Sequence, residues 1–181
     1  MPEDDAAACT GAQSASALAE SVVRSLSAKK MTITAAESCT GGMAADLIVR
    51  VPGASRVFWG SFVSYTEDAK MKMLGIPLKL IEEYGVVSRE TAAAMAEGAL
   101  KKSGASWAFS VTGFAGPESG GTGAAGTVWI AVAGAPYLKD TVEIMQETEA
   151  RMFFFSGNRN DVREKAAIAA LEMVLEKISL S

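Results

Sequence analysis

Short apolar segments alternate with amphipathic helical segments along this chain, and this alternation constrains the fold more than any other feature. Several of the apolar segments lack a polar face, which is typical of strands that are buried on both sides. Such strands need a layer of helices on each face of the sheet. We therefore predict an α/β fold, as a single three-layer α/β/α domain with a mixed, mostly parallel sheet. The predicted strands are Met31–Ala36, Val57–Tyr65, Trp107–Val111, Thr127–Ala133 and Thr141–Glu147, and the predicted helices include Gly42–Val51, Glu67–Leu74, Pro77–Tyr84 and Ser88–Lys102.

One domain is the expected organisation. A chain of 181 residues that is 49% apolar can bury one substantial core but is short for two. The first residues are small, polar or acidic, so we expect 1–13 to be a disordered tail and 14–181 to form the domain. The tail lacks an apolar signal core, and no export signal is expected.

Charge and cysteine content exclude several classes of protein. A net charge of −4 and a pI near 5.0 argue against broad attraction to nucleic acid or to an anionic membrane. The longest uncharged run, residues 119–138, is interrupted by glycines and Pro136, so it is not a membrane span. Cys9 and Cys39 make no disulfide framework, which suits a reducing cytoplasm. We expect a cytoplasmic protein.

Three unusual segments stand where predicted strands end: Glu37–Gly42, Tyr65–Lys70 and Thr112–Gly126. Ligands of α/β sheets usually lie beyond the carboxyl ends of the strands, so we predict that these segments form one composite site. The third segment is rich in glycine but matches neither a Walker sequence nor the dinucleotide fingerprint. It is either a flexible surface loop or a loop that covers the ligand.

Ser38 lies at the start of a predicted helix in a chain that contains no histidine. Free backbone N–H groups at a helix N-terminus can stabilise an oxyanion, so the Ser38 hydroxyl is a candidate nucleophile toward a carbonyl. Gly41 and Gly42 would let the oxyanion approach the backbone closely. Without an imidazole, the base is a lysine or a tyrosine. A lysine can act as the base only if burial or neighbouring charges lower its pKa toward neutrality.

Each of these residues also has an ordinary interpretation. Ser38 alone is typical of a helix N-cap, Lys70 of a solvated helix residue, and Tyr65 of a strand-end aromatic with a hydrated hydroxyl. Cys39 is intrinsically the better nucleophile, but without a histidine it is better interpreted as a small packing residue. Glu37 either bonds loop N–H groups, orients Lys70 or is a surface carboxylate.

Two arginines lie one helical turn apart near the start of the last helix, at Arg159 and Arg163. Their guanidinium groups suit the phosphate of a ligand. They equally suit pairing with Asp161, with Glu164 or with a second subunit.

Taken together, these motifs resemble the CinA C-terminal domain family. The resemblance runs from about Ser14 to Leu175, and several motifs agree in order and spacing. The motifs are Glu37-Ser38-Cys39-Thr40-Gly41-Gly42, Pro52-Gly53-Ala54-Ser55, Tyr65 with Lys70, Thr112-Gly113-Phe114-Ala115-Gly116-Pro117, Gly126-Thr127-Val128, and Asn158-Arg159 before Val162-Arg163.

The enzymatic members of this family are nicotinamide-nucleotide amidohydrolases of the PncC type. The resemblance implies hydrolysis of the carboxamide of nicotinamide mononucleotide to nicotinate mononucleotide and ammonia, with no metal and no cofactor. It makes Ser38 the nucleophile and Tyr65 and Lys70 its proton-handling partners, and it suggests a homodimer. The substrate-binding residues predicted on this basis are Glu37, Cys39, Thr40, Gly41, Gly42, Ser55, Thr112, Gly113, Gly116 and Arg159.

The chain departs from the family pattern at two places. Glu67 replaces the usual asparagine, and its carboxylate would raise the pKa of Lys70 and weaken it as a base. Glu118 and Ser119 stand where the family is usually richer in glycine. One alternative is therefore a catalytically weak or silent nucleotide-binding module that acts through a partner, and another is an amidase that depends on Cys39.

Overall fold

The computed structural model describes residues 14–117, 124–134 and 147–180. Its strands are β1 (Ile33–Glu37), β2 (Phe58–Val63), β3 (Trp107–Gly113), β4 (Thr127–Gly134) and β5 (Glu147–Phe154). They form one sheet in the order β2-β1-β3-β4-β5, in which β1 is parallel to β2 and β3, and β4 is antiparallel to β3 and β5. Four of the five strands thus run in one direction, and the predicted α/β fold with a mixed sheet is confirmed.

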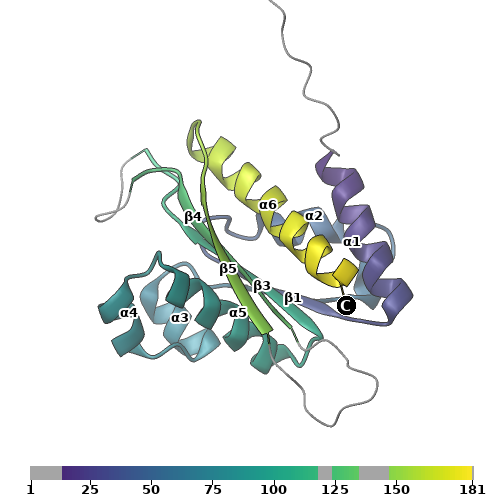
Figure 1. Ribbon diagram of the computed structural model, residues 1–181, viewed down its shortest axis with the longest axis horizontal. Coiled ribbons are helices and arrows are strands. Elements are labelled where there is room, and N and C mark those ends of the chain that lie inside the picture. Colours follow the sequence, from purple (N-terminus) through teal and green to yellow (C-terminus); the bar gives the residue numbers. More distant parts are fainter. Residues whose placement is uncertain (1–13, 118–123, 135–146, 181) are drawn as a thin grey trace, which may run out of the picture.

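Helices cover both faces of this sheet (Figure 1). One outer layer consists of α1 (Ala15–Lys29), α2 (Met43–Val49) and α6 (Arg159–Leu180), which contact one another. The other consists of α3 (Glu67–Leu74), α4 (Leu78–Tyr84) and α5 (Arg89–Ser103), and a short 3-10 helix, Ala54–Arg56, precedes β2. Within the described ranges, no helix is both long and apolar enough to cross a membrane.

The central strands β1 and β3 are the most deeply buried, because each has a strand on either side and helices on both faces. Every residue of β1 is buried, as are the residues of β3 before Gly113. Phe109 packs in the core beneath α1 and α6, whereas its neighbour Ala108 packs with Met95 beneath α5. Each large side chain buried in these layers contributes on the order of 2 kcal/mol.

Local sequence signals set the ends of α3, the helix that carries Lys70. The Thr66 hydroxyl accepts a hydrogen bond from the backbone N–H of Ala69 at 3.1 Å, which is a typical N-cap. Gly75 follows with a φ of 74°, a left-handed conformation that ends the helix. The predicted bounds, Glu67–Leu74, are confirmed.

The fifth strand lies further along the chain than the sequence predicts. We predicted Thr141–Glu147, of which only Glu147 is described, whereas β5 begins at Glu147 and ends at Phe154, a segment that the prediction missed. Residues 141–146 lie outside the described residues, as do the tail predicted for residues 1–13 and the two loop residues Glu118 and Ser119.

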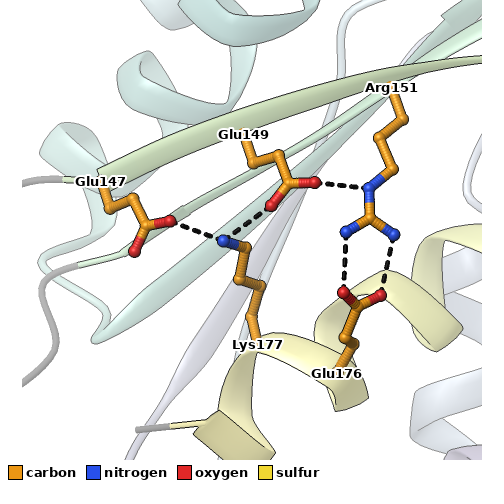
Figure 2. Close-up of polar contacts among 5 residues, drawn as sticks. All are labelled: Glu147, Glu149, Arg151, Glu176 and Lys177. Carbon is orange, nitrogen blue, oxygen red and sulfur yellow. Dashed lines mark hydrogen bonds and ion pairs between the residues drawn. The ribbon is translucent and has the colours of Figure 1, made fainter.

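The error has a physical cause in the charges of β5, which is an edge strand. Figure 2 shows Lys177 of α6 between Glu147 and Glu149, at 2.6 and 2.7 Å, and Arg151 paired with Glu149 and Glu176. These alternating charges interrupt the apolar pattern that marks a buried strand. Charged residues that point inward from an edge strand also discourage pairing with another chain.

The packing of α3 on α5 depends on a glycine. A methyl group added at Gly98 of α5 would overlap the carbonyl oxygen of Leu74 at the end of α3. We therefore expect Gly98→Ala to lower the free energy of unfolding by about 1–3 kcal/mol, although alanine is the better helix former. Chemical denaturation measures this change. Glu97→Ala, at the adjacent exposed position, should stay within about 0.5 kcal/mol, and equal effects would contradict the contact.

Candidate active site

The predicted composite site is a cavity of about 770 Å³ at the carboxyl ends of the parallel strands. All three segments singled out in the sequence line it, which confirms that they meet. Its volume lies in the usual range for small-molecule sites. The lining residues are Ser38, Cys39, Tyr65, Thr66, Glu67, Asp68, Lys70, Met71, Val86, Val87, Thr112, Gly113, Phe114, Ala115, Gly116 and Arg159.

Lys70 and Ser38 form a buried pair in this cavity. The Lys70 amine donates hydrogen bonds to the Ser38 hydroxyl and to the backbone carbonyl of Ser64, both at 2.9 Å. Only 1% of Lys70 and 8% of Ser38 is exposed. The backbone N–H of Ser64 in turn donates to the carbonyl of Glu37 at 2.9 Å, so the ends of β1 and β2 fix the position of the amine.

Burial changes the acidity of this amine. Loss of solvation lowers the pKa of Lys70 from its usual 10.5 to about 8, because a buried cation is disfavoured. A thiolate at Cys39 would act in the opposite direction, as the negative charge on Glu67 does. The predicted effect of Glu67 is therefore present, but burial outweighs it.

Cys39 is a poorer candidate for the nucleophile than its neighbour. Only 5% of its surface is exposed, and it belongs to the apolar core beneath α1 and α6. Burial raises the pKa of its thiol to about 11, so the thiolate is scarce near neutral pH.

The Glu37 carboxylate is fully buried and holds the turn that follows Ser38. It accepts hydrogen bonds from the backbone N–H groups of Gly42, Ala44 and Ala45 at 2.9, 3.1 and 3.0 Å, and from the Ser61 hydroxyl at 3.1 Å. Of the three interpretations of Glu37, bonding to loop N–H groups is the one that matches this geometry.

Internal hydrogen bonds occupy two of the backbone N–H groups that follow Ser38. The N–H of Gly42 is bonded to Glu37, and that of Gly41 donates to the carbonyl of Ser38 at 3.1 Å. Neither group is free to meet an oxyanion. The backbone N–H groups of Cys39 and Thr40 face the Cys39 sulfur.

Tyr65 and Arg159 lie together at the mouth of the cavity. The guanidinium of Arg159 donates to the Tyr65 hydroxyl at 2.7 Å and to the carbonyl of Gly116 at 2.8 Å. Tyr65 is 55% exposed, and the described partner of its hydroxyl is Arg159, whereas that of the Ser38 hydroxyl is Lys70. Deeper in the cavity, the Thr112 hydroxyl donates to the carbonyl of Val86 at 2.8 Å and ties β3 to the loop before α5.

Several predicted site residues lie outside the cavity lining. Glu37, Thr40, Gly41 and Gly42 form its supporting turn, and the buried hydroxyl of Thr40 has no hydrogen-bond partner among the described residues. Ser55 is exposed in the 3-10 helix before β2, where it lines a separate depression with Val51 and Phe58. The structure does not bring Ser55 to Ser38.

Sequence reasoning missed other parts of the site. Val86, Val87 and Phe114 line the cavity but carry no chemical signal in the sequence. Arg163 does not line it and instead bonds the backbone beside Ser38. Among the described residues, no group of three or more cysteine, aspartate or glutamate side chains is arranged to hold a metal ion.

Fold and cavity together define an α/β domain with a buried serine–lysine pair. Comparison with known proteins gives its family: the model of the CinA C-terminal domain matches residues 15–178, and the chain belongs to that family.

Relatives of known sequence support this placement. The chain is 43% identical over 162 residues to a putative competence-damage inducible protein of Caldicellulosiruptor bescii, and 45% identical over 159 residues to one of Symbiobacterium thermophilum. These matches cover 89% and 87% of the chain. They cover 37% of each relative, so the chain spans a little over a third of the length of those proteins.

Solved structures agree with the fold. A CinA superfamily protein of Escherichia coli superposes with a TM-score of 0.82 at 32% identity, covering 91% of this chain and 90% of that one. A competence/damage inducible protein of Agrobacterium tumefaciens gives a TM-score of 0.80 at 33% identity, with 91% and 95% coverage.

The buried amine predicts a pH dependence of stability. Because the pKa of Lys70 falls from 10.5 to about 8 on folding, only the unfolded chain holds this proton between those values, so stability rises with pH across the window. Urea denaturation from pH 7 to 10.5 measures the slope. Lys70→Met should remove this contribution, and identical slopes for the two proteins would contradict the lowered pKa.

Proposed function

We propose that this domain is a serine amidase that hydrolyses the carboxamide of nicotinamide mononucleotide to nicotinate mononucleotide and ammonia. The observation that carries the proposal is the 2.9 Å hydrogen bond between the Ser38 hydroxyl and the buried Lys70 amine, whose pKa is about 8. A hydroxyl is a weak nucleophile unless a neighbouring base accepts its proton. In this cavity the amine is the group placed to do so.

The neutral Lys70 amine has two N–H groups that donate hydrogen bonds and one lone pair that accepts a proton, and acylation uses the lone pair. The lone pair accepts the Ser38 proton as the serine oxygen attacks the carboxamide carbon, while one N–H continues to donate to the Ser64 carbonyl. The tetrahedral intermediate then collapses and its C–N bond breaks. The Lys70 ammonium supplies the proton with which the leaving group departs as ammonia.

Deacylation repeats the same proton movements with water. Water attacks the acyl carbon, Lys70 accepts its proton, and the C–O bond to Ser38 breaks as the proton returns to the serine oxygen. The products are the carboxylic acid, which loses its proton to the released ammonia or to solvent, and the regenerated pair. A proton-handling role for Tyr65 stays a prediction, as does the homodimer.

The mouth of the cavity supports a substrate that carries phosphate. Arg159 lines the cavity and is exposed there, with its guanidinium between Tyr65 and Gly116. A guanidinium binds phosphate through paired, charge-assisted hydrogen bonds. We assign it to the phosphate of the nucleotide, with the carboxamide directed inward to Ser38.

One observation favours the alternative of a weak or silent nucleotide-binding module. Glu67 lines the same cavity, and its charge raises the pKa of Lys70 and so reduces the fraction of neutral amine. Binding of nicotinamide mononucleotide without release of ammonia would favour this alternative.

Ammonia release from nicotinamide mononucleotide tests the amidase directly. We expect Ser38→Ala to lower kcat at least about 10³-fold, since the nucleophile is lost. Lys70→Ala should lower it about 10²- to 10⁴-fold through loss of the base. Cys39→Ala, at the adjacent position, is the matched control and should retain activity. Activity that survives Ser38→Ala but not Cys39→Ala would contradict the serine mechanism.

The carboxylate of Glu67 gives a second test, through the pH profile of kcat/KM. The rate should rise with pH and level off with an apparent pKa near 8, because the neutral amine is the base. Glu67→Gln removes a charge that raises this pKa, so the profile should move to lower pH. Asp68→Asn is the control, because Asp68 lines the cavity but pairs with Lys72. A profile that Glu67→Gln leaves in place would exclude Lys70 as the titrating group.

A further inference from the structure

We propose that Arg163 is a positioning residue that, opposite Glu37, holds the turn Ser38–Gly42 so that the Ser38 hydroxyl stays within reach of Lys70. The inference rests on the proposed function in one respect, which is that Ser38 is the nucleophile. It assigns to Arg163 a role in the reaction although Arg163 lies outside the cavity lining.

Arg163 reaches the turn from α6, more than 120 residues further along the chain. Its Nε donates to the carbonyl of Cys39 at 3.1 Å, and its Nη2 donates to the carbonyl of Thr40 at 2.9 Å. Its Nη1 donates to the side-chain oxygen of Asn160 at 3.1 Å, which orients the guanidinium. The planar fork thus holds two successive carbonyls of the residues that follow the nucleophile.

Glu37 binds the N–H groups of the same turn whose carbonyl groups Arg163 binds. Its carboxylate accepts the N–H groups of Gly42, Ala44 and Ala45, while Arg163 donates to the carbonyls before them. One charged side chain therefore binds the donors of the turn and another binds its acceptors. Hydrogen bonds to charged groups are stronger than those between neutral groups.

The Arg163 guanidinium lies in van der Waals contact with the turn at Gly41. Gly41 has a φ of 61°, and a Cβ there would lie 3.5 Å from Nη2 of Arg163. The guanidinium is therefore packed directly against the turn. Because Arg163 does not line the cavity, whereas Arg159 does, Arg163 is poorly placed to bind a substrate phosphate.

Positioning matters because the reaction tolerates little displacement. A reacting group that moves by about 1 Å can lose about 100-fold in rate. Ser38 is anchored on one side by its N–H, which donates to the Val111 carbonyl at 2.9 Å. Beyond Ser38 the chain reverses direction, and there the Arg163 and Glu37 bonds set its path.

Three variants of the full chain test this inference. Arg163→Ala should lower kcat about 100-fold with little change in KM, because the substrate-binding groups stay in place. Arg163→Lys keeps the positive charge but lacks the planar guanidinium that donates to two carbonyls, so its kcat should lie between those of Arg163→Ala and wild type. Lys165→Ala is the matched control, since Lys165 on the same helix donates to the Ser156 carbonyl at 2.7 Å, away from the turn. Lys165→Ala should behave as wild type. Added guanidinium ion should partly restore the kcat of Arg163→Ala and should not change that of Lys165→Ala.

A second readout needs no knowledge of the substrate. A fluorophosphonate, which modifies activated serines, should label Ser38 about 100-fold more slowly in Arg163→Ala, as followed by mass spectrometry on protein whose circular dichroism confirms folding. Wild-type labelling without ammonia release would reject nicotinamide mononucleotide as the substrate but leave the positioning role standing. Equal labelling and equal kcat in Arg163→Ala and Lys165→Ala would overturn the inference. A wild-type Ser38 that neither reacts nor turns over would overturn both proposals.

Discussion

The hydrogen bond between Lys70 and Ser38 is the interaction on which the functional account depends. It requires an amine that is almost completely removed from water, and that removal lowers the pKa of Lys70 to about 8. An exposed lysine would remain a cation at neutral pH and could not accept the serine proton. The fold achieves this burial by packing α3 against α5, with the Lys70 amine bonded to Ser38 and to the Ser64 carbonyl where β1 and β2 end.

Burial of Lys70 also has a thermodynamic consequence. Below about pH 8 the folded protein must hold a buried cation, which disfavours the folded state relative to the solvated, unfolded one. Surrounding structure compensates: β1 and β3 are covered on both faces, and the turn after β1 is bonded by Glu37 and Arg163. Functional sites often retain groups that lower the free energy of unfolding, because the rest of the fold contributes enough stability to offset that cost.

Much of the fold was predictable because its signals are local. Thr66 and Gly75 mark the ends of α3 in the sequence itself, and the apolar runs mark β1 and β3. The meeting of three segments in one cavity followed from where the strands end. Two features were not predictable in this way: β5, whose charges pair with a distant helix, and Arg163, whose partners at Cys39 and Thr40 are distant in the sequence.

The most direct test of the account is the pKa of the Lys70 amine itself. Nuclear magnetic resonance of protein with isotope-labelled lysine side chains, assigned with Lys70→Met, measures this value in the folded chain without any substrate. The account predicts titration near pH 8, well below the usual lysine value of 10.5. A Lys70 amine that titrates near 10.5 would be a cation throughout the neutral range, and it could not activate Ser38 as a base.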